Sequence, residues 1–310
     1  MTDIAIRAER LSKRYGEMLA VDGVDLAIPR GQFFGLLGPN GAGKTSTVHM
    51  LSTLIAPSAG EAWVAGYPVQ REKLAVRRSI GVVFQDAALD ATLSVAENLR
   101  FAGRLNDLPR AELERRSVEL LELFGLNDKR DHPVATLSGG QRRTLDIARG
   151  MIHQPQILFL DEPTTGLDLP NRRAIWRYIA GLRARHGITV FLTTHYLEEA
   201  ADCDEVAFLN AGRIVRSGSP RALIEELGRY IVEIESDRPQ ELAEQLAARL
   251  GPALIEADRL QFRCNKEPHE LASLQAELAL GAKAVRWRRP NLNDVFLWVN
   301  QGRISQRRAA

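Results

Sequence analysis

Short apolar runs alternate with helical patterns along the first part of the chain. Phe33–Leu37, Ile157–Leu160 and Ile188–Leu192 are almost continuously apolar, which is typical of strands buried on both faces of a parallel sheet. Between the last two runs, the stretch Arg172–Arg185 predicts a helix. Because strands that alternate with helices usually form parallel sheets, the pattern predicts an α/β fold.

Other segments before residue 152 extend this prediction. Thr45–Leu54 contains adequate helix formers, and we expect Pro57 to end that helix. Asn98–Leu126 is rich in Leu, Glu and Arg at helical spacing, most clearly in Ala111–Leu123. The remaining predictions are strands at Ile4–Tyr15, Val21–Ile28, Glu61–Val64 and Ser79–Phe84, and a helix at Ser138–Met151 capped by its serine.

The alternation of strands and helices starts again near Gly228. We therefore expect a first domain over residues 1–228, a small C-terminal α/β domain over 229–302, and a frayed basic tail over 303–310. The elements predicted for the small domain are strands at Tyr230–Glu235, Arg259–Cys264 and Ala282–Trp287, and helices at Pro239–Leu250, Glu270–Leu280 and Asn293–Val299.

Composition narrows the class of protein. The 310 residues are 45% hydrophobic and 26% charged, as in a globular protein with a sizeable core, and the net charge of +2 gives no indication of nucleic-acid binding. Cys203 and Cys264 lie far apart, without metal-type spacing. No run approaches the roughly 18 apolar residues that span a bilayer, and the charged N-terminus does not resemble a signal peptide. We expect a soluble protein that reaches a membrane only through a partner.

The strongest motif is a glycine-rich loop between a predicted strand and a predicted helix. Its glycines let successive N–H groups point at phosphate oxygens, and the following helix adds its positive N-terminal end. We expect Lys44 to neutralise the β- and γ-phosphates of a nucleotide and the Thr45 hydroxyl to bind Mg²⁺. This phosphate loop fits the known pattern in full and consists of Gly38, Pro39, Asn40, Gly41, Ala42, Gly43, Lys44 and Thr45.

Two carboxylates, Asp161 and Glu162, follow the apolar run Ile157–Leu160 directly. Asp161 can hold Mg²⁺ directly or through water, and Glu162 can polarise an attacking water as a general base. An acidic pair after a strand can also simply cap a helix. Its combination with the phosphate loop favours a site that hydrolyses a nucleotide.

The segment Leu137–Gln141, LSGGQ, resembles the signature sequence of ABC ATPases and precedes Asp161 by the spacing of that family. Ser138 is placed to cap a helix that begins with the flexible Gly139 and Gly140, and such a helix end attracts anions. In the architecture that the resemblance implies, this end serves the ATP of a second subunit.

Further matches complete the resemblance. Tyr15, in LSKRYG, is similar to the aromatic residue that stacks on adenine, and Gln85, in GVVFQD, to the glutamine that contacts Mg²⁺ and water and senses the membrane partner. Asp168, in TTGLDL, resembles the residue that links the two subunits, and His195, in FLTTH, the histidine that contacts the γ-phosphate. The ATP-binding residues implied in this way are Tyr15, the phosphate loop, Ser46, Ser138, Gly139, Gly140 and Gln141.

The resemblance covers residues 3–226 and implies a P-loop NTPase core with antiparallel β and α-helical subdomains, the helical one over about residues 86–152. It also implies a homodimer closed around Mg-ATP and a separately encoded membrane permease. The chain would then lie in the cytoplasm, on the inner face of the cell membrane. A resemblance to the drug and polyketide exporter branch, of the daunorubicin-resistance type, rests on LSGGQRRTLDIARGMIHQPQILFLDEPTTGLD, THYLEEAADCDEV and the ending Pro290–Leu297. It implies export of a drug-like or other amphipathic substrate.

The same resemblance places the permease-docking groove between Gln85 and the helical stretch near Asn98. The apolar residues there fit a docking surface and an ordinary core equally well. They are Ala87, Ala88, Leu89 and Leu93.

Three alternative functions are less consistent with the sequence. A soluble ABC ATPase of translation or DNA repair usually has two ATPase units or a long coiled coil, and this chain has neither. An importer subunit of the sugar type tends to carry a longer, β-rich C-terminal domain. A nucleotide sensor without activity is disfavoured because Glu162 and His195 are both present.

Overall fold

The computed structural model describes residues 3–85, 88–278 and 282–307. The chain forms two compact units, Met1–Val215 and Arg216–Ala310. The predicted boundary lay near Gly228. The structure groups the intervening helix α7 (Pro220–Glu225) with the second unit, because it packs against α10 (Leu292–Arg307) of that unit.

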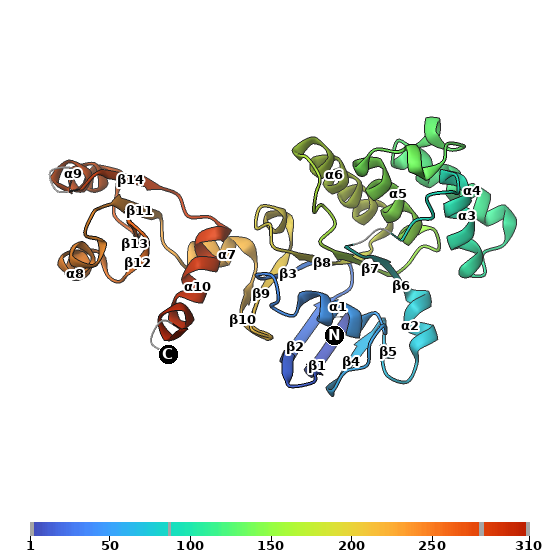
Figure 1. The fold of residues 1–310 in the computed structure, drawn as a ribbon, viewed down its shortest axis with the longest axis horizontal. Helices are drawn as coiled ribbons and strands as arrows, with labels where there is room; N and C mark the ends of the chain where they lie inside the picture. Colours follow the sequence, from blue (N-terminus) through green and yellow to red (C-terminus); the bar gives the residue numbers. More distant parts are fainter. Residues whose placement is uncertain (1–2, 86–87, 279–281, 308–310) are drawn as a thin grey trace. The chain divides into compact units, whose positions relative to one another are not determined.

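A six-stranded sheet forms the centre of the first unit (Figure 1), in the order β10-β9-β3-β8-β7-β6. Pairing is parallel along β9-β3-β8-β7-β6, so the carboxyl ends of these strands meet at one edge. The apolar runs are buried throughout in β3 and β7, as expected. The strands are β3 (Phe33–Leu37), β6 (Ile80–Val83), β7 (Ile157–Asp161), β8 (Thr189–Thr194), β9 (Glu205–Asn210) and β10 (Arg213–Gly218).

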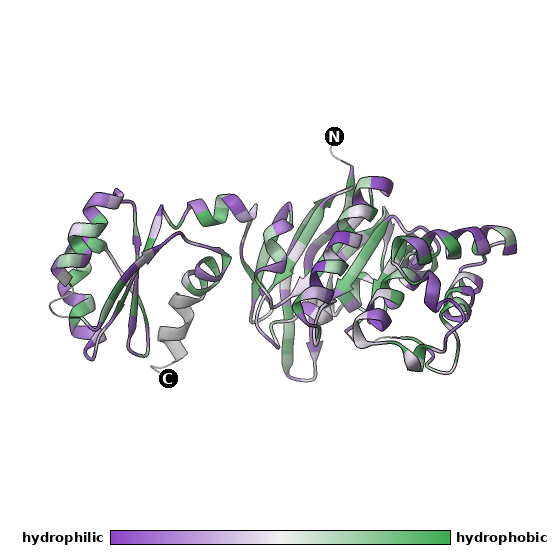
Figure 2. Cartoon of the chain, turned by 90° about the horizontal axis from the view of Figure 1, so that it is seen from above, coloured by the Kyte–Doolittle hydropathy of each residue, from purple (hydrophilic) through white to green (hydrophobic). Residues whose placement is uncertain are grey.

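A second, antiparallel sheet has the order β2-β1-β4-β5. Its apolar side chains share one core with α1 (Lys44–Leu51) and with the parallel sheet. Helix α1 therefore lies between the two sheets. Figure 2 shows hydrophobic and hydrophilic residues along the strands. The strands are β1 (Ile4–Tyr15), β2 (Met18–Pro29), β4 (Ala59–Val64) and β5 (Tyr67–Pro68).

Helices of the first unit cover the other face of the parallel sheet, where α5 (Gly139–Met151) contacts both β6 and α6 (Leu169–His186). Ser138 caps α5 with a complete capping box, as predicted. The remaining helices are α2 (Lys73–Ser79), α3 (Val95–Leu105), α4 (Arg110–Leu123) and the 3₁₀ turns Asn127–Lys129, Val134–Thr136 and Glu199–Asp202.

Several predicted boundaries are wrong. The helix that follows the phosphate loop ends at Leu51 rather than Leu54, because Thr53 adopts a positive φ of 65°. The helical stretch 98–126 is two helices, separated at Asp107, which also has a positive φ, and at Pro109, which precedes α4. Ser79 belongs to α2 and not to the strand that follows it.

The second unit is a four-stranded sheet in the order β12-β13-β11-β14 with its own apolar core. The length predicted for the final helix is wrong, because α10 runs from Leu292 to Arg307 and so includes most of the residues that were expected to form a frayed tail. The end predicted for the preceding helix, Leu280, lies outside the described residues. The elements are β11 (Tyr230–Glu235), α8 (Pro239–Leu250), β12 (Ala253–Glu256), β13 (Arg259–Cys264), α9 (Pro268–Leu278) and β14 (Ala284–Arg288).

Candidate functional site

The loop between β3 and α1 folds tightly because two of its glycines have no room for a side chain. A Cβ atom on Gly38 would lie 2.2 Å from the carbonyl oxygen of Leu209, and one on Gly43 would lie 2.3 Å from that of Ala20. Gly43 also has φ +106°, where glycine is favoured. The loop therefore leads directly into the N-terminus of α1, a position at which anions bind.

Lys44 is the first residue of α1 and its side chain turns back over the loop. Its Nζ donates hydrogen bonds to the carbonyl oxygens of Gly38 at 2.9 Å and Pro39 at 3.2 Å. The same nitrogen lies 3.2 Å from Oε1 of Glu162, and both side chains are buried. A positive charge is thus held at the centre of the loop by groups from two different elements.

Asp161 ends β7 as a fully buried carboxylate. The hydroxyl of Thr193, on the neighbouring strand β8, donates a hydrogen bond to its Oδ1. Thr45 Oγ1 lies 3.4 Å from the same oxygen. The structure therefore brings together, beside the phosphate loop, two oxygen atoms of the hard kind that Mg²⁺ prefers.

Glu162 has an unusual backbone and a crowded carboxylate. Its φ is +46°, a strained value for a residue with a side chain, and its N–H donates to the carbonyl oxygen of Thr193 at 3.0 Å. Oε2 lies 3.2 Å from Nδ1 of His195. Burial alone raises the pKa of Glu162, but the charge and hydrogen bond of Lys44, with the His195 contact, outweigh it and lower the pKa below its usual value. The carboxylate is therefore ionised at neutral pH, as a general base must be.

A cavity of about 520 Å³ opens at this edge of the sheet. It brings together side chains that lie far apart in the sequence, including Gln85, Glu162 and His195. Tyr15 stands at the cavity with 42% of its surface exposed, and its hydroxyl lies 3.4 Å from Ser46 Oγ. The lining residues are Tyr15, Met18, Ala20, Asn40, Gly41, Ala42, Gly43, Lys44, Thr45, Ser46, Gln85, Glu162, Thr165 and His195.

The predicted signature residues do not line this cavity. Gly139 and Gly140 begin α5, and Ser138 and Gln141 form its capping box through hydrogen bonds of 3.0 and 3.2 Å. A Cβ on Gly140 would lie 2.5 Å from the side chain of Asn171 in α6. Asp168 caps α6 by accepting from the Asn171 N–H at 3.0 Å. The signature residues and Asp168 therefore form a second cluster, at the adjacent N-termini of two helices.

Comparison with known proteins agrees with this geometry. Residues 21–165 match the family model described as ABC transporter. The chain is 41% identical over 305 residues to the daunorubicin resistance ATP-binding protein DrrA3 of Streptomyces coeruleorubidus, covering 96% of both chains. It is likewise 41% identical to the Nod factor export ATP-binding protein I of Ralstonia nicotianae, covering 94% of this chain and 92% of that one. The chain belongs to the ABC transporter ATP-binding protein family. The predicted resemblance to the daunorubicin-resistance type is confirmed by the first of these relatives.

Solved structures extend the comparison to the fold. CbiO1 of Clostridium perfringens, described as part of the ABC transporter complex cbiONQ, matches with a TM-score of 0.67 and 29% identity over 80% of this chain and 96% of that one. An ATP-binding cassette solved as a dimer with ADP and Pi after hydrolysis matches with a TM-score of 0.64 and 27% identity, covering 69% and 98%. This ABC protein therefore binds and hydrolyses ATP. No helix among its described residues is long and apolar enough to cross a membrane.

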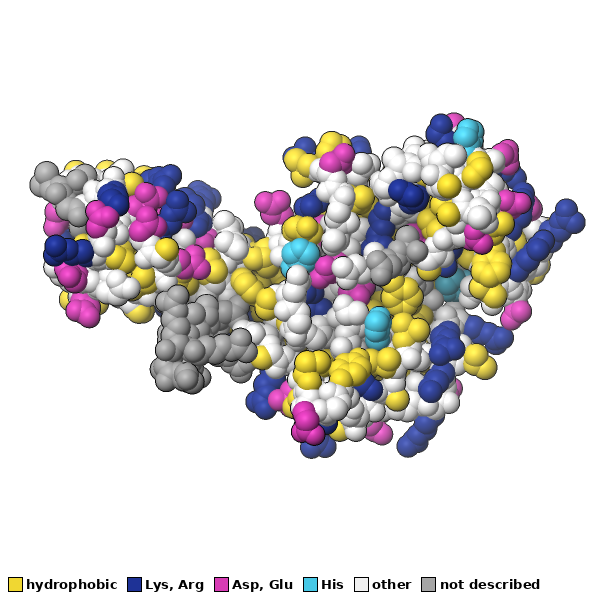
Figure 3. Space-filling view, viewed as in Figure 1, with side chains coloured by type: hydrophobic (Ala, Val, Ile, Leu, Met, Phe, Trp, Pro, Cys, Tyr) yellow, Lys and Arg dark blue, Asp and Glu magenta, His cyan; other side chains and the backbone are white. Residues whose placement is uncertain are grey.

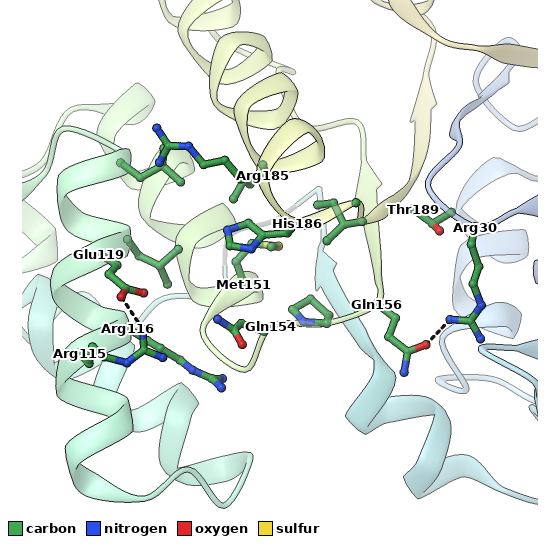
Figure 4. Close-up of a pocket in the computed structure, with 16 residues that line it drawn as sticks. Arg30, Arg115, Arg116, Glu119, Met151, Gln154, Gln156, Arg185, His186 and Thr189 are labelled. Carbon is green, nitrogen blue, oxygen red and sulfur yellow. Dashed lines mark hydrogen bonds and ion pairs between the residues drawn. The ribbon is translucent and has the colours of Figure 1, made fainter.

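A larger cavity, of about 680 Å³, lies at the opposite ends of β7 and β8 (Figure 4). It is rich in arginine, but several of these cations already have partners. Arg115 pairs with Glu112 and Glu119, and Arg116 with Glu112. Arg30 donates to Gln156 at 2.5 Å. Of the two cavities, only the smaller has the loop and carboxylates that ATP hydrolysis needs.

Sequence reasoning missed three residues that shape the site. Arg143 of α5 donates hydrogen bonds to backbone carbonyl groups on both sides of Glu162. Thr193 holds both Asp161 and Glu162, and Glu199 accepts hydrogen bonds from the hydroxyls of Thr164 and Thr194. Burial raises the pKa of Glu199, against the effect of those hydrogen bonds. Of these three residues, only Thr193 could have been noticed in the sequence, because it belongs to the threonine pair immediately before His195.

Proposed function

We propose that two copies of this ATPase pair head to tail. Each ATP would then lie between the phosphate loop of one chain and the residues Ser138–Gln141 of the other. The observation that carries this proposal is the separation of the two clusters within one chain, since the signature residues do not line the cavity formed by the phosphate loop. An exposed helix N-terminus that starts with Gly139, which has open space around it, suits the phosphates of a partner's nucleotide.

Mg²⁺ fits the oxygen atoms at the end of β7. Thr45 Oγ1 and Asp161 Oδ1 are 3.4 Å apart, and both are the hard ligands that this ion prefers. We propose that these two residues hold the ion with the phosphate oxygens, and that Gln85 at the cavity wall joins them. Bound there, the ion would neutralise charge that develops on the phosphates.

We propose that Glu162 and the residues around it carry out hydrolysis. Its ionised carboxylate accepts a proton from the attacking water, and His195, 3.2 Å away, faces the γ-phosphate. Lys44 turns from Glu162 to the β- and γ-phosphates when ATP binds. Tyr15 provides an exposed ring on which adenine stacks. Asp168 contacts the partner chain beside the shared nucleotide.

We further propose export of a drug-like or other amphipathic substrate through a separate permease at the inner membrane face. The names of the relatives above support this. Helix α3 exposes 57% of Phe101 and 69% of Leu105, one turn apart on the same face, and Figure 3 shows apolar side chains at the surface over this helix. Ala88 is exposed, and Leu89 and Leu93 are half-buried, which favours docking over an ordinary core. Ala87 lies outside the described residues.

The phosphate loop is tested by Lys44→Ala. The change removes the only side-chain cation on the loop, so ATP hydrolysis should fall to background while thermal unfolding remains cooperative. Lys73→Ala, on the exposed start of α2, is the matched control and should keep wild-type turnover. Wild-type turnover in the Lys44 variant would refute the site.

The export proposal is tested by co-purification with the protein of an adjacent gene that has about six apolar spans.

A further inference from the structure

Arg143 is a buried arginine in the second turn of α5, with only 7% of its surface exposed. Its guanidinium donates to the carbonyl oxygen of Pro163 at 2.6 Å and to those of Asp161 and Glu162 at 3.2 and 3.3 Å. It also donates to the carbonyl oxygen of Phe84. One side chain therefore binds the backbone of two segments, one containing Glu162 and the other leading into Gln85.

Asp146, one turn further along α5, contacts the same region. Its buried carboxylate lies 3.6 Å from Arg143 and 3.0 Å from Arg149, and it accepts a hydrogen bond from the backbone of Ala88. Burial raises the pKa of Asp146, against these charges. The segment that contains Gln85 is thus anchored to α5 on both sides, by Arg143 at Phe84 and by Asp146 at Ala88.

The backbone at Glu162 requires such support. A φ of +46° is strained for a residue with a side chain, and it persists only where the surroundings impose it. Thr193 binds the N–H of Glu162, and Arg143 binds its carbonyl group and both neighbouring carbonyl groups. The direction of the Glu162 carboxylate follows from this backbone.

We infer that Arg143 is a positioning residue for ATP hydrolysis. It fixes the positions of Glu162 and Gln85 relative to each other. The inference rests on the roles proposed above for those two residues. Arg143 lies two residues after Gln141 on the same helix, so a movement of α5 is transmitted to both segments. Arginine suits this position because its planar group has five donors in fixed directions, whereas the lysine ammonium has three and no such plane.

The test is Arg143→Lys, which keeps the charge but cannot bind both segments in the same way. The matched control is Arg142→Lys, since Arg142 is the adjacent residue on α5 and is exposed. We expect kcat to fall by roughly 10- to 100-fold, because small misplacements of reacting groups have effects of this size. The dissociation constant of Mg-ATP should change less than threefold, because the hydrogen bonds of Arg143 described above reach no phosphate-loop residue.

A structural role alone would lower the fraction of active molecules and leave their affinities unchanged. The vanadate complex with Mg-ADP separates the two cases. A positioning role predicts that affinity for this transition-state analogue falls by the same factor as kcat/KM, while its binding stoichiometry per folded chain is unchanged. If Arg143→Lys unfolds, Arg143→Gln is measured in the same way, and the stoichiometry corrects for any unfolded fraction.

Three results are decisive. Wild-type kcat in the folded variant, or unchanged vanadate affinity beside a reduced kcat, overturns the inference. An equal loss of Mg-ATP affinity also overturns it, since the residue would then serve binding. Glu162→Gln is assayed in parallel, and undiminished hydrolysis there would instead remove the proposed role of Glu162.

Discussion

Replacing Glu162 by glutamine should have two opposite effects, slower hydrolysis and tighter ATP binding. In the structure, Lys44 Nζ lies 3.2 Å from Glu162 Oε1. This ion pair competes with the phosphates for the same lysine, because Lys44 has to turn toward ATP when it binds. Glutamine has the same shape as glutamate and no charge, so the competing interaction is weakened.

The size of the second effect follows from the contact. A buried hydrogen bond to a charged group contributes about 1.5–3 kcal/mol. Complete loss of this contribution would tighten ATP binding by roughly 10- to 100-fold, since about 1.4 kcal/mol corresponds to a factor of ten. Glu162→Gln should give part of this gain, because the neutral amide binds Lys44 more weakly than the carboxylate does. Loss of the general base should slow hydrolysis by about 10²- to 10⁴-fold. Both effects together favour a persistent ATP-bound dimer.

The affinity is measured by titrating a fluorescent ATP analogue without Mg²⁺ at protein concentrations where the chain is monomeric, which excludes dimer closure. Size-exclusion chromatography with Mg-ATP then tests whether the dimer persists. Glu119→Gln is the control, because it makes the same chemical change at an exposed ion pair away from the nucleotide cavity. Equal or weaker affinity in Glu162→Gln would show that the ion pair with Lys44 does not oppose ATP binding.

Two further predictions concern stability and domain independence. The folded pKa of Glu162 lies below its ordinary value of 4.5, so its stabilising interactions are complete above that pH and are lost as pH falls through the folded pKa. The free energy of unfolding of nucleotide-free wild type should therefore approach that of Glu162→Gln below about pH 4.5, and a constant difference from pH 6 to 3 would contradict this. A chain that ends at Gly218 should bind ATP with unchanged affinity, because every cavity residue precedes Tyr196, and a folded truncation that cannot bind ATP would contradict this independence.

The sequence predicted the parallel strands and the phosphate loop well for a simple physical reason. Strands such as β3 and β7 are buried on both faces, so their residues are almost all apolar. The phosphate loop is equally readable, because Gly38 and Gly43 have no space for a side chain. In both cases a local requirement determines the residue types directly.

Other features depend on contacts between distant segments and leave a weaker pattern. The limits of α10 were missed although its apolar residues were visible, because its polar continuation resembles a tail. Arg143 looks like one of several arginines that follow the signature segment, and only the structure shows that it binds carbonyl groups near residues 84 and 162. The strained φ of Glu162 likewise has no counterpart in the sequence.

The central claim is that each ATP site is shared between two chains, and mixed dimers test it most directly. One chain carries Lys44→Ala and the other Gly139→Asp, and both carry Glu162→Gln so that bound ATP is retained. The aspartate has room, since a Cβ on Gly139 would meet nothing within 4 Å, and its charge would repel the γ-phosphate. If the sites are shared, one site of each mixed dimer combines an intact phosphate loop with an intact signature segment, and the other site carries both lesions. Each mixed dimer should therefore trap one ATP. Dimers made of either variant chain alone should trap none. Mixed dimers that assemble but trap no ATP would contradict the head-to-tail arrangement.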